Sequence, residues 1–445
     1  MPYIPHTPEE QRAMLETIGV SSVEELFADI PRSLRPKSFN LPEGLSEMAV
    51  RARLEQLALK NDATLTSFLG AGFYNHYIPS AVQALISRGE FYTAYTPYQP
   101  EASQGTLQAI YEYQTAVCRL MDMEYANASM YDGGTAIYEA MMMAVRKTDR
   151  TKIVVSESLN PIYRCMLDCY TSSLNLERIT VAHDNGATDV QALLDAVDDQ
   201  TAAVIVQNPD FFGNINDYSA LFARAREKKV VSIISAYPVL QSILKTPGEM
   251  KADIAVAEGQ SLGLPLSFGG PYLGIMTCRK ELIRQMPGRI VGKTVDSRGR
   301  TGYVLTLQAR EQHIRRQKAT SNICSNQALC ALQSLVYLCL LGPEGLSRTA
   351  AICLERARYA MERLTSIPGV ELVNRGPVGN EFAVRLPVNA YEIIHKLNNR
   401  DCVPGFPLGR YYPGMENCLL VACTETNTEE QIGVMAEMLK GALHP

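Results

Sequence analysis

Ile254-Ala255-Val256-Ala257-Glu258-Gly259-Gln260-Ser261-Leu262-Gly263 is the stretch that decides the fold. Its first four residues form a short apolar run, which is typical of a strand buried on both faces, and a polar glycine-containing turn follows. Similar runs occur at Lys152–Ser156, Ala202–Gln207, Val230–Ser235 and Tyr272–Thr277. These runs predict the strands of one buried sheet.

Segments with helical patterning fall between the apolar runs, at Gly134–Lys147, Val190–Val197 and Tyr218–Lys228. Strands that alternate with helices predict an α/β fold whose mostly parallel sheet is covered on both faces. In such a sheet, ligands bind beyond the carboxyl ends of the strands. The residues directly after each strand are therefore the candidate site.

Three divisions of the chain are expected. Residues 1–66 form an N-terminal helical arm, in which Thr7-Pro8-Glu9-Glu10 and Ser21-Ser22 are helix starts. Residues 67–340 form a large α/β domain that ends in a long helix, Asn322–Leu341, stopped by Gly342 and Pro343. Residues 341–445 form a small α+β C-terminal domain. Its expected helices are Leu346–Ser366, Ala390–Asn398 and Thr428–Leu443, and its expected strands lie near Val370–Val373, Phe382–Leu386 and Cys418–Cys423.

Composition excludes several classes of protein. The net charge of −5 lacks the basic excess of a nucleic-acid binder, and no apolar run approaches the roughly 20 residues that span a bilayer. The eleven cysteines form no paired framework, and the N-terminus lacks the features of a signal peptide, so reduced thiols in a cytoplasm are expected. We find no metal-ligand spacing, and His76 and His313 are expected to have structural roles.

Gly133, Gly134 and Thr135 follow a strand candidate near Ala126–Met130 and open a helix. Backbone N–H groups at such a helix start can hold a phosphate, although a plain strand-to-helix turn has the same pattern. Two other turns complete the edge: Ser235-Ala236-Tyr237 follows its strand, and Gln260 lies in the turn quoted above. A glycine-rich stretch, Phe268–Gly274, comes next.

This layout resembles the fold-type I enzymes that depend on pyridoxal phosphate. In that class an aspartate usually pairs with the pyridine nitrogen and a lysine forms the Schiff base, whereas this chain has Ser235 and Gln260 at the matching positions. A glutamine amide cannot form the imine, and serine cannot replace a buried carboxylate. The nearest lysines, Lys245 and Lys251, precede the Ile254–Ala257 strand. Misaligned strands, with the lysine elsewhere, are the alternative.

Several motifs together resemble one family, the P-protein of the glycine cleavage system, and within it the alpha chains (subunit 1) of two-chain members. The motifs are Tyr3-Ile4-Pro5-His6-Thr7, Phe68-Leu69-Gly70-Ala71-Gly72-Phe73-Tyr74, Ala94-Tyr95-Thr96-Pro97-Tyr98-Gln99-Pro100-Glu101, Ser103-Gln104-Gly105, Leu262-Gly263 with Gly269-Gly270-Pro271-Tyr272, and Lys318-Ala319-Thr320-Ser321-Asn322-Ile323-Cys324. The resemblance extends over the whole chain.

The resemblance implies a division of labour between two chains. A beta chain carries the pyridoxal phosphate lysine, two copies of each chain form an α2β2 heterotetramer, and this chain binds no cofactor covalently. The complex is an oxidoreductase, glycine dehydrogenase (aminomethyl-transferring), which decarboxylates glycine and passes the aminomethyl group to the lipoyl arm of H-protein. The isolated chain is then inactive, and its own pocket is empty or partly filled by its own side chains.

Fold-type I sites lie at a dimer interface, so this chain can build a wall of its partner's active site. The candidates are Tyr95, Thr96, Tyr98 and Gln99, whose alternative role is in a capped loop or as core aromatics, and Ser321, Asn322 and Gln327, whose alternative role is an ordinary helix N-cap. Gly133, Gly134 and Thr135 are then a vestigial phosphate cup. Two other functions remain open: a self-sufficient pyridoxal phosphate enzyme, and a non-enzymatic scaffold or regulatory subunit.

Overall fold

The computed structural model describes residues 6–38, 40–62, 64–323 and 325–444. Tyr3-Ile4-Pro5 and Cys324, which belong to the quoted motifs, lie outside the described residues. The contacts divide the chain into two units, Met1–Ala63 and Thr64–Pro445. The expected boundary after residue 66 lies near this division, and the expected boundary after residue 340 remains a prediction.

The first unit consists of short helices without a buried core. Its elements are α1 (Pro8–Ile18), η1 (Val23–Phe27), η2 (Arg32–Leu34) and α2 (Glu47–Ala58), and none of them has a buried residue. Thr7 caps α1 in a reciprocal pair with Glu10, as its sequence predicts. The second expected start, at Ser22, opens only a 3₁₀ turn.

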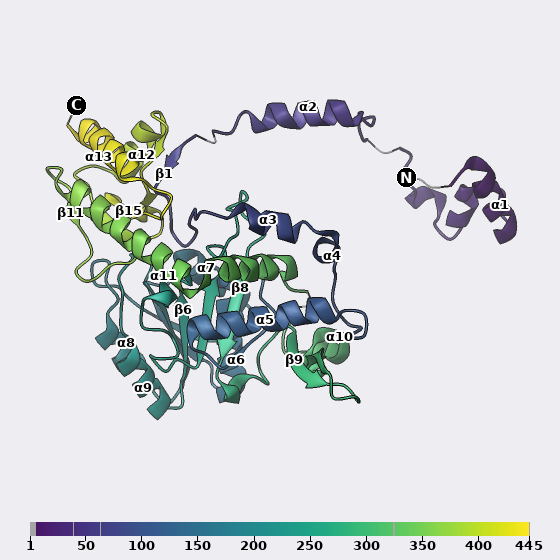
Figure 1. Cartoon of the computed structure of the whole chain (residues 1–445), viewed down its shortest axis with the longest axis horizontal. Helices are drawn as coiled ribbons and strands as arrows, with labels where there is room; N and C mark the ends of the chain where they lie inside the picture. The colour runs from purple at the N-terminus through teal and green to yellow at the C-terminus, as the bar shows by residue number, and fades with distance from the viewer. Residues whose placement is uncertain (1–5, 39, 63, 324, 445) are drawn as a thin grey trace. The chain divides into compact units, whose positions relative to one another are not determined.

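The second unit is built on a seven-stranded sheet with the order β2-β8-β7-β6-β5-β3-β4. Figure 1 labels two of its strands, β6 and β8. Its strands are β2 (Tyr125–Ala126), β3 (Lys152–Ser156), β4 (Glu177–Val181), β5 (Thr201–Asn208), β6 (Val231–Ala236), β7 (Ile254–Glu258) and β8 (Gly274–Cys278). The five strands from β4 to β7 run parallel, as expected, while β8 runs antiparallel to both of its neighbours. The strand expected at 126–130 shrinks to β2 and one isolated bridge at Met130.

The direction of β8 has a consequence for the site. Antiparallel strands need no crossover helix, so the connection between Glu258 and Gly274 returns at the same end of the sheet, where these two residues face each other. The whole loop 259–273 therefore lies at the carboxyl edge of the parallel strands. This is the edge at which such sheets bind ligands.

Helices cover both faces of the sheet, and alternate residues of the strands enter different cores. Val204 and Ile234 belong to one apolar cluster, together with Phe222 of α9, whereas Ile205 belongs to a second cluster with Ile137 of α6. The helices of this region are α3 (Ser80–Ile86), α4 (Gly89–Tyr92), α5 (Gln104–Met121), α6 (Gly133–Thr148), α7 (Pro161–Thr171), α8 (Val190–Ala196), α9 (Ser219–Glu227) and α10 (Gln312–Arg315). Both faces are buried, which explains the almost continuous apolar runs.

Smaller elements complete this region. They are the antiparallel hairpin β9 (Ile290–Val295) and β10 (Thr301–Thr306), and the 3₁₀ turns η3 (Val239–Ser242), η4 (Lys280–Leu282), η5 (Gln308–Arg310) and η6 (Arg316–Lys318). The hairpin and the edge strand β4 have mixed burial, so their sequences do not form clear apolar runs and do not predict strands.

The long helix α11 (Ala328–Thr365) begins six residues after the expected start at Asn322, so that prediction was wrong. Gly342 has φ 62° and ψ −178°, and with Pro343 it kinks the helix where the sequence predicts a stop. Among the described residues, α11 is the one helix long and apolar enough to cross a membrane. Its residues Leu335 and Leu364 instead enter two apolar clusters, so α11 is a core helix of the protein.

The C-terminal part has an antiparallel sheet with the order β11-β12-β15-β14 and its own apolar cluster. Its elements are β11 (Glu371–Leu372), β12 (Glu381–Arg385), α12 (Ala390–Asn398), β14 (Phe406–Pro407), η7 (Leu408–Arg410), β15 (Cys418–Ala422) and α13 (Glu429–Leu443). A separate parallel pair joins β1 (Thr66–Ser67) to β13 (Cys402–Val403). The expected helices and strands of this region occur within a few residues of their predicted bounds.

Candidate functional site

Gln260 lies in the turn after β7 and is almost fully buried. Its Oε1 accepts a hydrogen bond from the backbone N–H of Tyr74 at 3.0 Å, and its Nε2 donates to the carbonyl oxygens of Tyr74 and Leu264 at 3.0 and 2.8 Å. The amide thus joins segment 68–77 to loop 259–273. Lys251 precedes β7 and lies at the opposite end of the strand, as the sequence analysis predicts.

Glu258 occupies the start of helix α6, where a phosphate was considered. Its Oε2 accepts from the N–H of Gly133 at 2.9 Å, and its Oε1 accepts from the N–H groups of Gln260 and Leu273 at 3.0 and 3.3 Å. Burial raises the pKa of Glu258 to about 8, although the three N–H donors oppose this shift. The Glu258 carboxyl therefore occupies the position at which a phosphate would accept from these N–H groups.

The three residues of the expected phosphate cup are closed in. A Cβ atom added at Gly133 would lie 2.5 Å from the Tyr163 hydroxyl, and one at Gly134 would lie 2.3 Å from the Met166 sulfur. The backbone N–H of Thr135 donates to Asp132, which caps the helix. The side chains around this helix start leave no open cup.

A cavity of about 30 Å³ remains at this edge of the sheet. Ser235, Glu258, Tyr163, Glu381 and Asp210 are among the residues that line it. Ligand pockets usually measure about 300–1,000 Å³, so this cavity has room for a water molecule rather than a coenzyme. The residues here do not fit pyridoxal phosphate, because the amine is replaced by a bonded amide and the anion position is filled.

Two further buried acids border the cavity. Glu381 comes from β12 and accepts from the N–H of Ala71 at 2.6 Å and the hydroxyl of Tyr74 at 2.9 Å. Burial raises its pKa to about 7. Burial also raises the pKa of Asp210 to about 6, and Asp210 accepts bonds from Thr188 and Asn214. Segment 68–77 is thus held by Gln260 on one side and by Glu381 on the other.

The loop that holds Tyr95, Thr96, Tyr98 and Gln99 lies on the surface. The side chains of Tyr95 and Tyr98 are 78% and 47% exposed. The Tyr98 hydroxyl accepts a bond from the buried Arg289 guanidinium at 3.1 Å, and that group lies 5.5 Å from the centre of the Tyr98 ring. The Tyr98 hydroxyl oxygen therefore already accepts a bond from a cation.

Segment 321–327 precedes α11 and meets the tyrosine loop. The Tyr95 hydroxyl lies 3.2 Å from the Ser325 Oγ, so the structure brings the two candidate segments together. Ser321 donates to Glu139 of α6 at 2.5 Å and Asn322 is exposed, but both lie before the helix rather than at its first turn. Gln327 precedes Ala328 directly, and its backbone N–H donates to Ser129. Neither Ser321 nor Asn322 is a helix N-cap.

Comparisons with known proteins agree with the sequence motifs. The model of the family described as "Glycine cleavage system P-protein" matches residues 1–439. A relative from Maridesulfovibrio salexigens, named "Probable glycine dehydrogenase (decarboxylating) subunit 1", is 70% identical over 443 residues and covers 100% of both chains. The chain belongs to the glycine cleavage system P-protein family. The family resemblance inferred from the sequence is confirmed, and this P-protein chain is one subunit of an enzyme.

Two solved structures bear on the fold of this P-protein chain. A crystal structure of glycine decarboxylase (P-protein) of the glycine cleavage system, in inhibitor-bound form, has a TM-score of 0.94 and 43% identity, with 100% of both chains covered. The glutamate decarboxylase of Lactobacillus brevis has a TM-score of 0.70 at 16% identity, over 95% of this chain and 97% of that one. The fold-type I architecture predicted from the sequence is confirmed.

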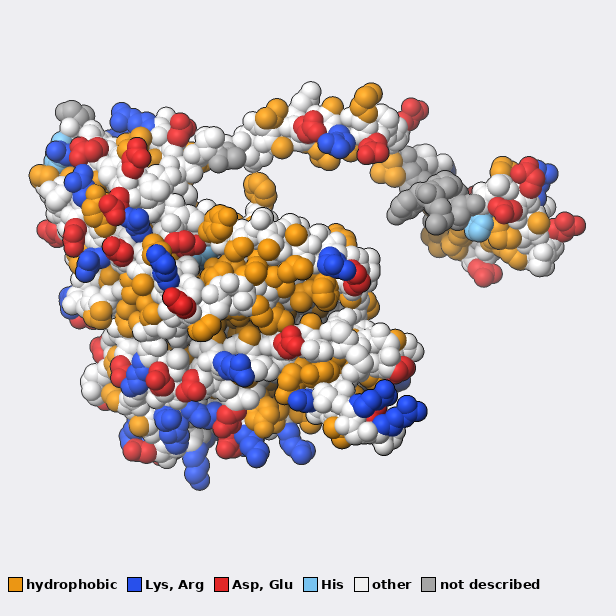
Figure 2. Space-filling model, viewed as in Figure 1, with side chains coloured by type: hydrophobic (Ala, Val, Ile, Leu, Met, Phe, Trp, Pro, Cys, Tyr) orange, Lys and Arg blue, Asp and Glu red, His pale blue; other side chains and the backbone are white. Residues whose placement is uncertain are grey.

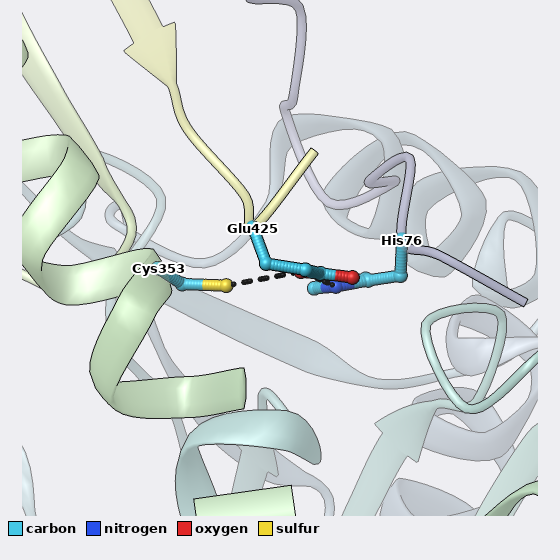
Figure 3. A group of neighbouring side chains, drawn as sticks. All are labelled: His76, Cys353 and Glu425. Atoms are coloured by element: carbon cyan, nitrogen blue, oxygen red, sulfur yellow. Dashed lines mark hydrogen bonds and ion pairs between the residues drawn. The ribbon is translucent and has the colours of Figure 1, made fainter. Parts of the chain in front are cut away.

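The P-protein chain also contains a buried cluster that sequence reasoning missed, because its members are far apart in the chain. His76, Cys353 and Glu425 offer ligand atoms within 4.8 Å of one another (Figure 3). Glu425 accepts from His76 Nδ1 at 2.7 Å and from Cys353 at 3.4 Å, while His76 Nε2 is bonded to the Tyr237 hydroxyl. Both ring nitrogens are therefore engaged.

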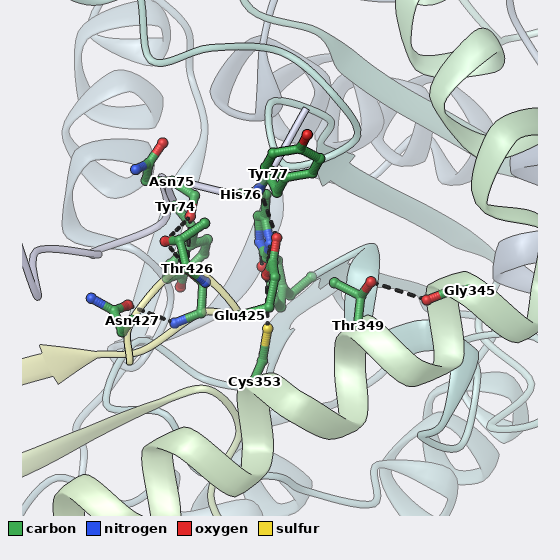
Figure 4. Close-up of polar contacts among 12 residues, drawn as sticks. Tyr74, Asn75, His76, Tyr77, Gly345, Thr349, Cys353, Glu425, Thr426 and Asn427 are labelled. Atoms are coloured by element: carbon green, nitrogen blue, oxygen red, sulfur yellow. Dashed lines mark hydrogen bonds and ion pairs between the residues drawn. The ribbon is translucent and has the colours of Figure 1, made fainter. Parts of the chain in front are cut away.

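This cluster ties three segments of the chain together (Figure 4). The Glu425 Oε1 accepts from the N–H of Tyr77 at 2.7 Å, and Thr424 donates to the Asn75 carbonyl oxygen at 2.7 Å. Burial raises the pKa of the Cys353 thiol, so the thiolate that a metal would need is disfavoured. These contacts fit the structural role expected for His76.

We expect a chelator to leave the stability of this chain unchanged. Because the hydrogen bonds of the cluster satisfy each group without an ion, removing divalent metals takes nothing from the folded state. Thermal unfolding in EDTA should match unfolding without EDTA within the error of the measurement. A lowered Tm that zinc restores would show that the cluster holds a metal.

Proposed function

We propose that this chain is the subunit of a two-chain glycine decarboxylase that does not bind the cofactor. The observation that carries the proposal is the small pocket at the sheet edge, where Gln260 bonds to the backbone and the Glu258 carboxyl occupies the helix start. The relatives named subunit 1 support the existence of a partner. In the complex, glycine is decarboxylated and its aminomethyl group passes to lipoylated H-protein.

The partner in this proposal is a homologous beta chain whose lysine holds pyridoxal phosphate, in an α2β2 assembly located in the cytoplasm. The cofactor supplies an electron sink for the loss of CO2 when it is bound in that chain. An exposed apolar surface supports such a partner. Figure 2 shows hydrophobic side chains gathered over α3, α5 and the first half of α11, and Leu85, Tyr92 and Leu340 are exposed.

Within the complex, the tyrosine loop and segment 321–327 would form a wall of the partner's site. Tyr95 and Tyr98 present aromatic faces and hydroxyl groups, and Thr96, Gln99, Ser321, Asn322 and Gln327 add polar groups nearby in the chain. The bonds from Arg289 to Tyr98 and between Tyr95 and Ser325 hold these side chains before any partner arrives. Such a wall can orient the substrate and exclude water.

We predict that Tyr98→Ala lowers the rate of glycine decarboxylation by the assembled complex by about 10- to 100-fold, the usual contribution of a positioning group. Alanine removes the ring that Arg289 supports and the hydroxyl that can donate to the partner's site. Tyr98→Phe keeps the ring and should show a smaller loss. Release of CO2 from carboxyl-labelled glycine, measured with both chains, H-protein and pyridoxal phosphate, is the assay.

The matched control is Tyr391→Ala, because Tyr391 is 51% exposed on α12, away from both candidate segments in the chain. It should keep wild-type activity. If Tyr98→Ala assembles normally and decarboxylates glycine at the wild-type rate, this chain does not contribute Tyr98 to a shared site.

The division of labour between the chains has a separate test. The purified chain, mixed with pyridoxal phosphate and reduced with borohydride, should contain no labelled peptide, and co-expression with the lysine-bearing chain should give one complex labelled only on that chain. A labelled peptide from this chain would favour the self-sufficient enzyme. Failure of the two chains to co-purify would remove the partner from the proposal.

A further inference from the structure

Loop 259–273 exposes one large apolar side chain almost completely. Phe268 is 98% exposed, more than any other large hydrophobic residue among those described. Residues 261–273 contain no charged side chain, so the surface around the exposed ring is not made more polar by charged neighbours in this stretch. An isolated phenylalanine in water is a cost to the free chain, and an aromatic ring is a frequent anchor at protein interfaces.

The backbone around Phe268 is strained. Ser267 and Phe268 have φ values of 43° and 53°, and Gly269 and Gly270 continue with 118° and 125°. Glycine adopts positive φ freely, but a serine and a phenylalanine side by side in this region each cost free energy. Such conformations persist where the surrounding structure holds them, and they place the Phe268 side chain outward.

Several contacts hold the base of this loop. The Tyr272 hydroxyl and the Gly269 N–H both donate to the Leu266 carbonyl oxygen, at 2.7 and 3.1 Å. The Tyr272 ring stacks on Phe73 with 4.7 Å between ring centres. The Gln260 amide adds its bond to Leu264, so the residue that stands in place of the lysine also supports the loop.

We propose that Phe268 is a preformed anchor that inserts into an apolar pocket of the lysine-bearing partner chain. This inference rests on the proposed function and names the contact by which the two chains lock together. The position of the loop supports this partner, because the loop rises from the carboxyl edge of the sheet beside the closed pocket. Leu69 and Tyr77, in segment 68–77, are also exposed, and this segment bonds to the base of the loop through Gln260.

The chemistry of the loop argues against other occupants. A membrane-binding loop usually adds lysine or arginine beside its apolar residues, and residues 261–273 have neither. A rigid aromatic side chain loses little conformational freedom when it is buried by a partner, so it binds a protein pocket efficiently. A second copy of this chain is an outcome that the experiment distinguishes.

The test is the affinity between the two separately purified full-length chains, measured by calorimetry for wild type, Phe268→Ala, Phe268→Leu and the control Tyr391→Ala. We expect Phe268→Ala to raise the Kd at least about 30-fold, the usual effect of removing an interface anchor, and Phe268→Leu to raise it less. Tyr391→Ala should bind like wild type. Because Phe268 is exposed in the free chain, its variants should unfold at the wild-type temperature.

The outcomes separate this inference from the proposed function. If wild-type chains bind and Phe268→Ala binds within threefold of them, the anchor is wrong while the partnership stands. If the wild-type chains do not bind each other, the proposed function fails first. If Phe268→Ala instead breaks up a dimer of this chain and leaves the affinity for the partner unchanged, the loop anchors a second copy and the inference is overturned.

Discussion

The Gln260→Leu variant is expected to lose about 3 kcal/mol of the free energy of unfolding, measured by urea denaturation. Leucine has nearly the same shape as glutamine but cannot bond to Tyr74 or Leu264. One N–H and two carbonyl groups are then left buried without the partner that they have now. The same variant should also weaken binding of the partner chain, because the amide supports the Phe268 loop.

Gln108→Leu is the control for this experiment. Gln108 lies on α5 and is exposed, and its side chain donates a hydrogen bond to Glu112, one turn along the same helix. We expect this substitution to change the free energy of unfolding by less than about 0.5 kcal/mol. Equal stability of the two variants would show that the bonds of the Gln260 amide do not stabilise the fold and that other contacts hold segment 68–77.

The second large effect is a fall in stability as the pH rises from about 5 to about 8. Burial raises the pKa of Glu258 from 4.5 to about 8, so this carboxyl takes up a proton on folding. Raising the pH through this window removes the proton from the unfolded chain first, which favours unfolding by roughly 3–5 kcal/mol at the upper end. Glu381 and Asp210 shift in the same direction.

Urea denaturation of wild type and Glu258→Gln between pH 5 and pH 8 isolates the share of Glu258. The amide cannot titrate, so the free energy of unfolding of the variant should depend less on pH. In Glu258→Gln, the NH2 group of the new amide would face the Gly133 N–H, so the bond from Gly133 is lost. This loss lowers the free energy of unfolding of the variant by the same amount at every pH. Parallel curves for the two proteins would mean that Glu258 stays ionised in the folded chain.

The strands were predictable because they depend on a local pattern, and the absence of the lysine stays a prediction from the same pattern. A strand buried on both faces must be apolar throughout, so runs such as Ile254–Ala257 stand out from the polar turns around them. The turn after a strand of this type holds the residues that contact a ligand, which allowed Gln260 and Ser235 to be identified from their order in the chain. Helix caps such as Thr7 were predictable too, because a cap bonds to residues only three positions away in the chain.

Elements with mixed exposure were not predictable in this way. Strand β4 lies at the sheet edge and the β9–β10 hairpin has exposed and buried positions without a clear pattern, so their sequences resemble loops. The start of α11 was placed six residues too early, at Asn322, although the residues directly before Ala328 are the polar Ser325, Asn326 and Gln327. Gln327, the N-cap residue of α11, makes no side-chain capping bond, so no local signal marks the first residue of this helix.

By itself, the amino-acid sequence determined the family and the alternation of strands and helices, and it predicts that Gln260 stands at the position of the Schiff-base lysine. Only the tertiary structure decided which side chains occupy the carboxyl edge of the sheet. Glu258 was visible in the sequence, but its role depends on Gly133, which lies 125 residues away, and on an antiparallel β8 that returns the chain to the same edge. In the sequence, Phe268 likewise has no feature that distinguishes it from other apolar residues. Its almost complete exposure appears only in the folded chain. Contacts between distant segments carry no local signal, because they exist only once the sheet has brought those segments together.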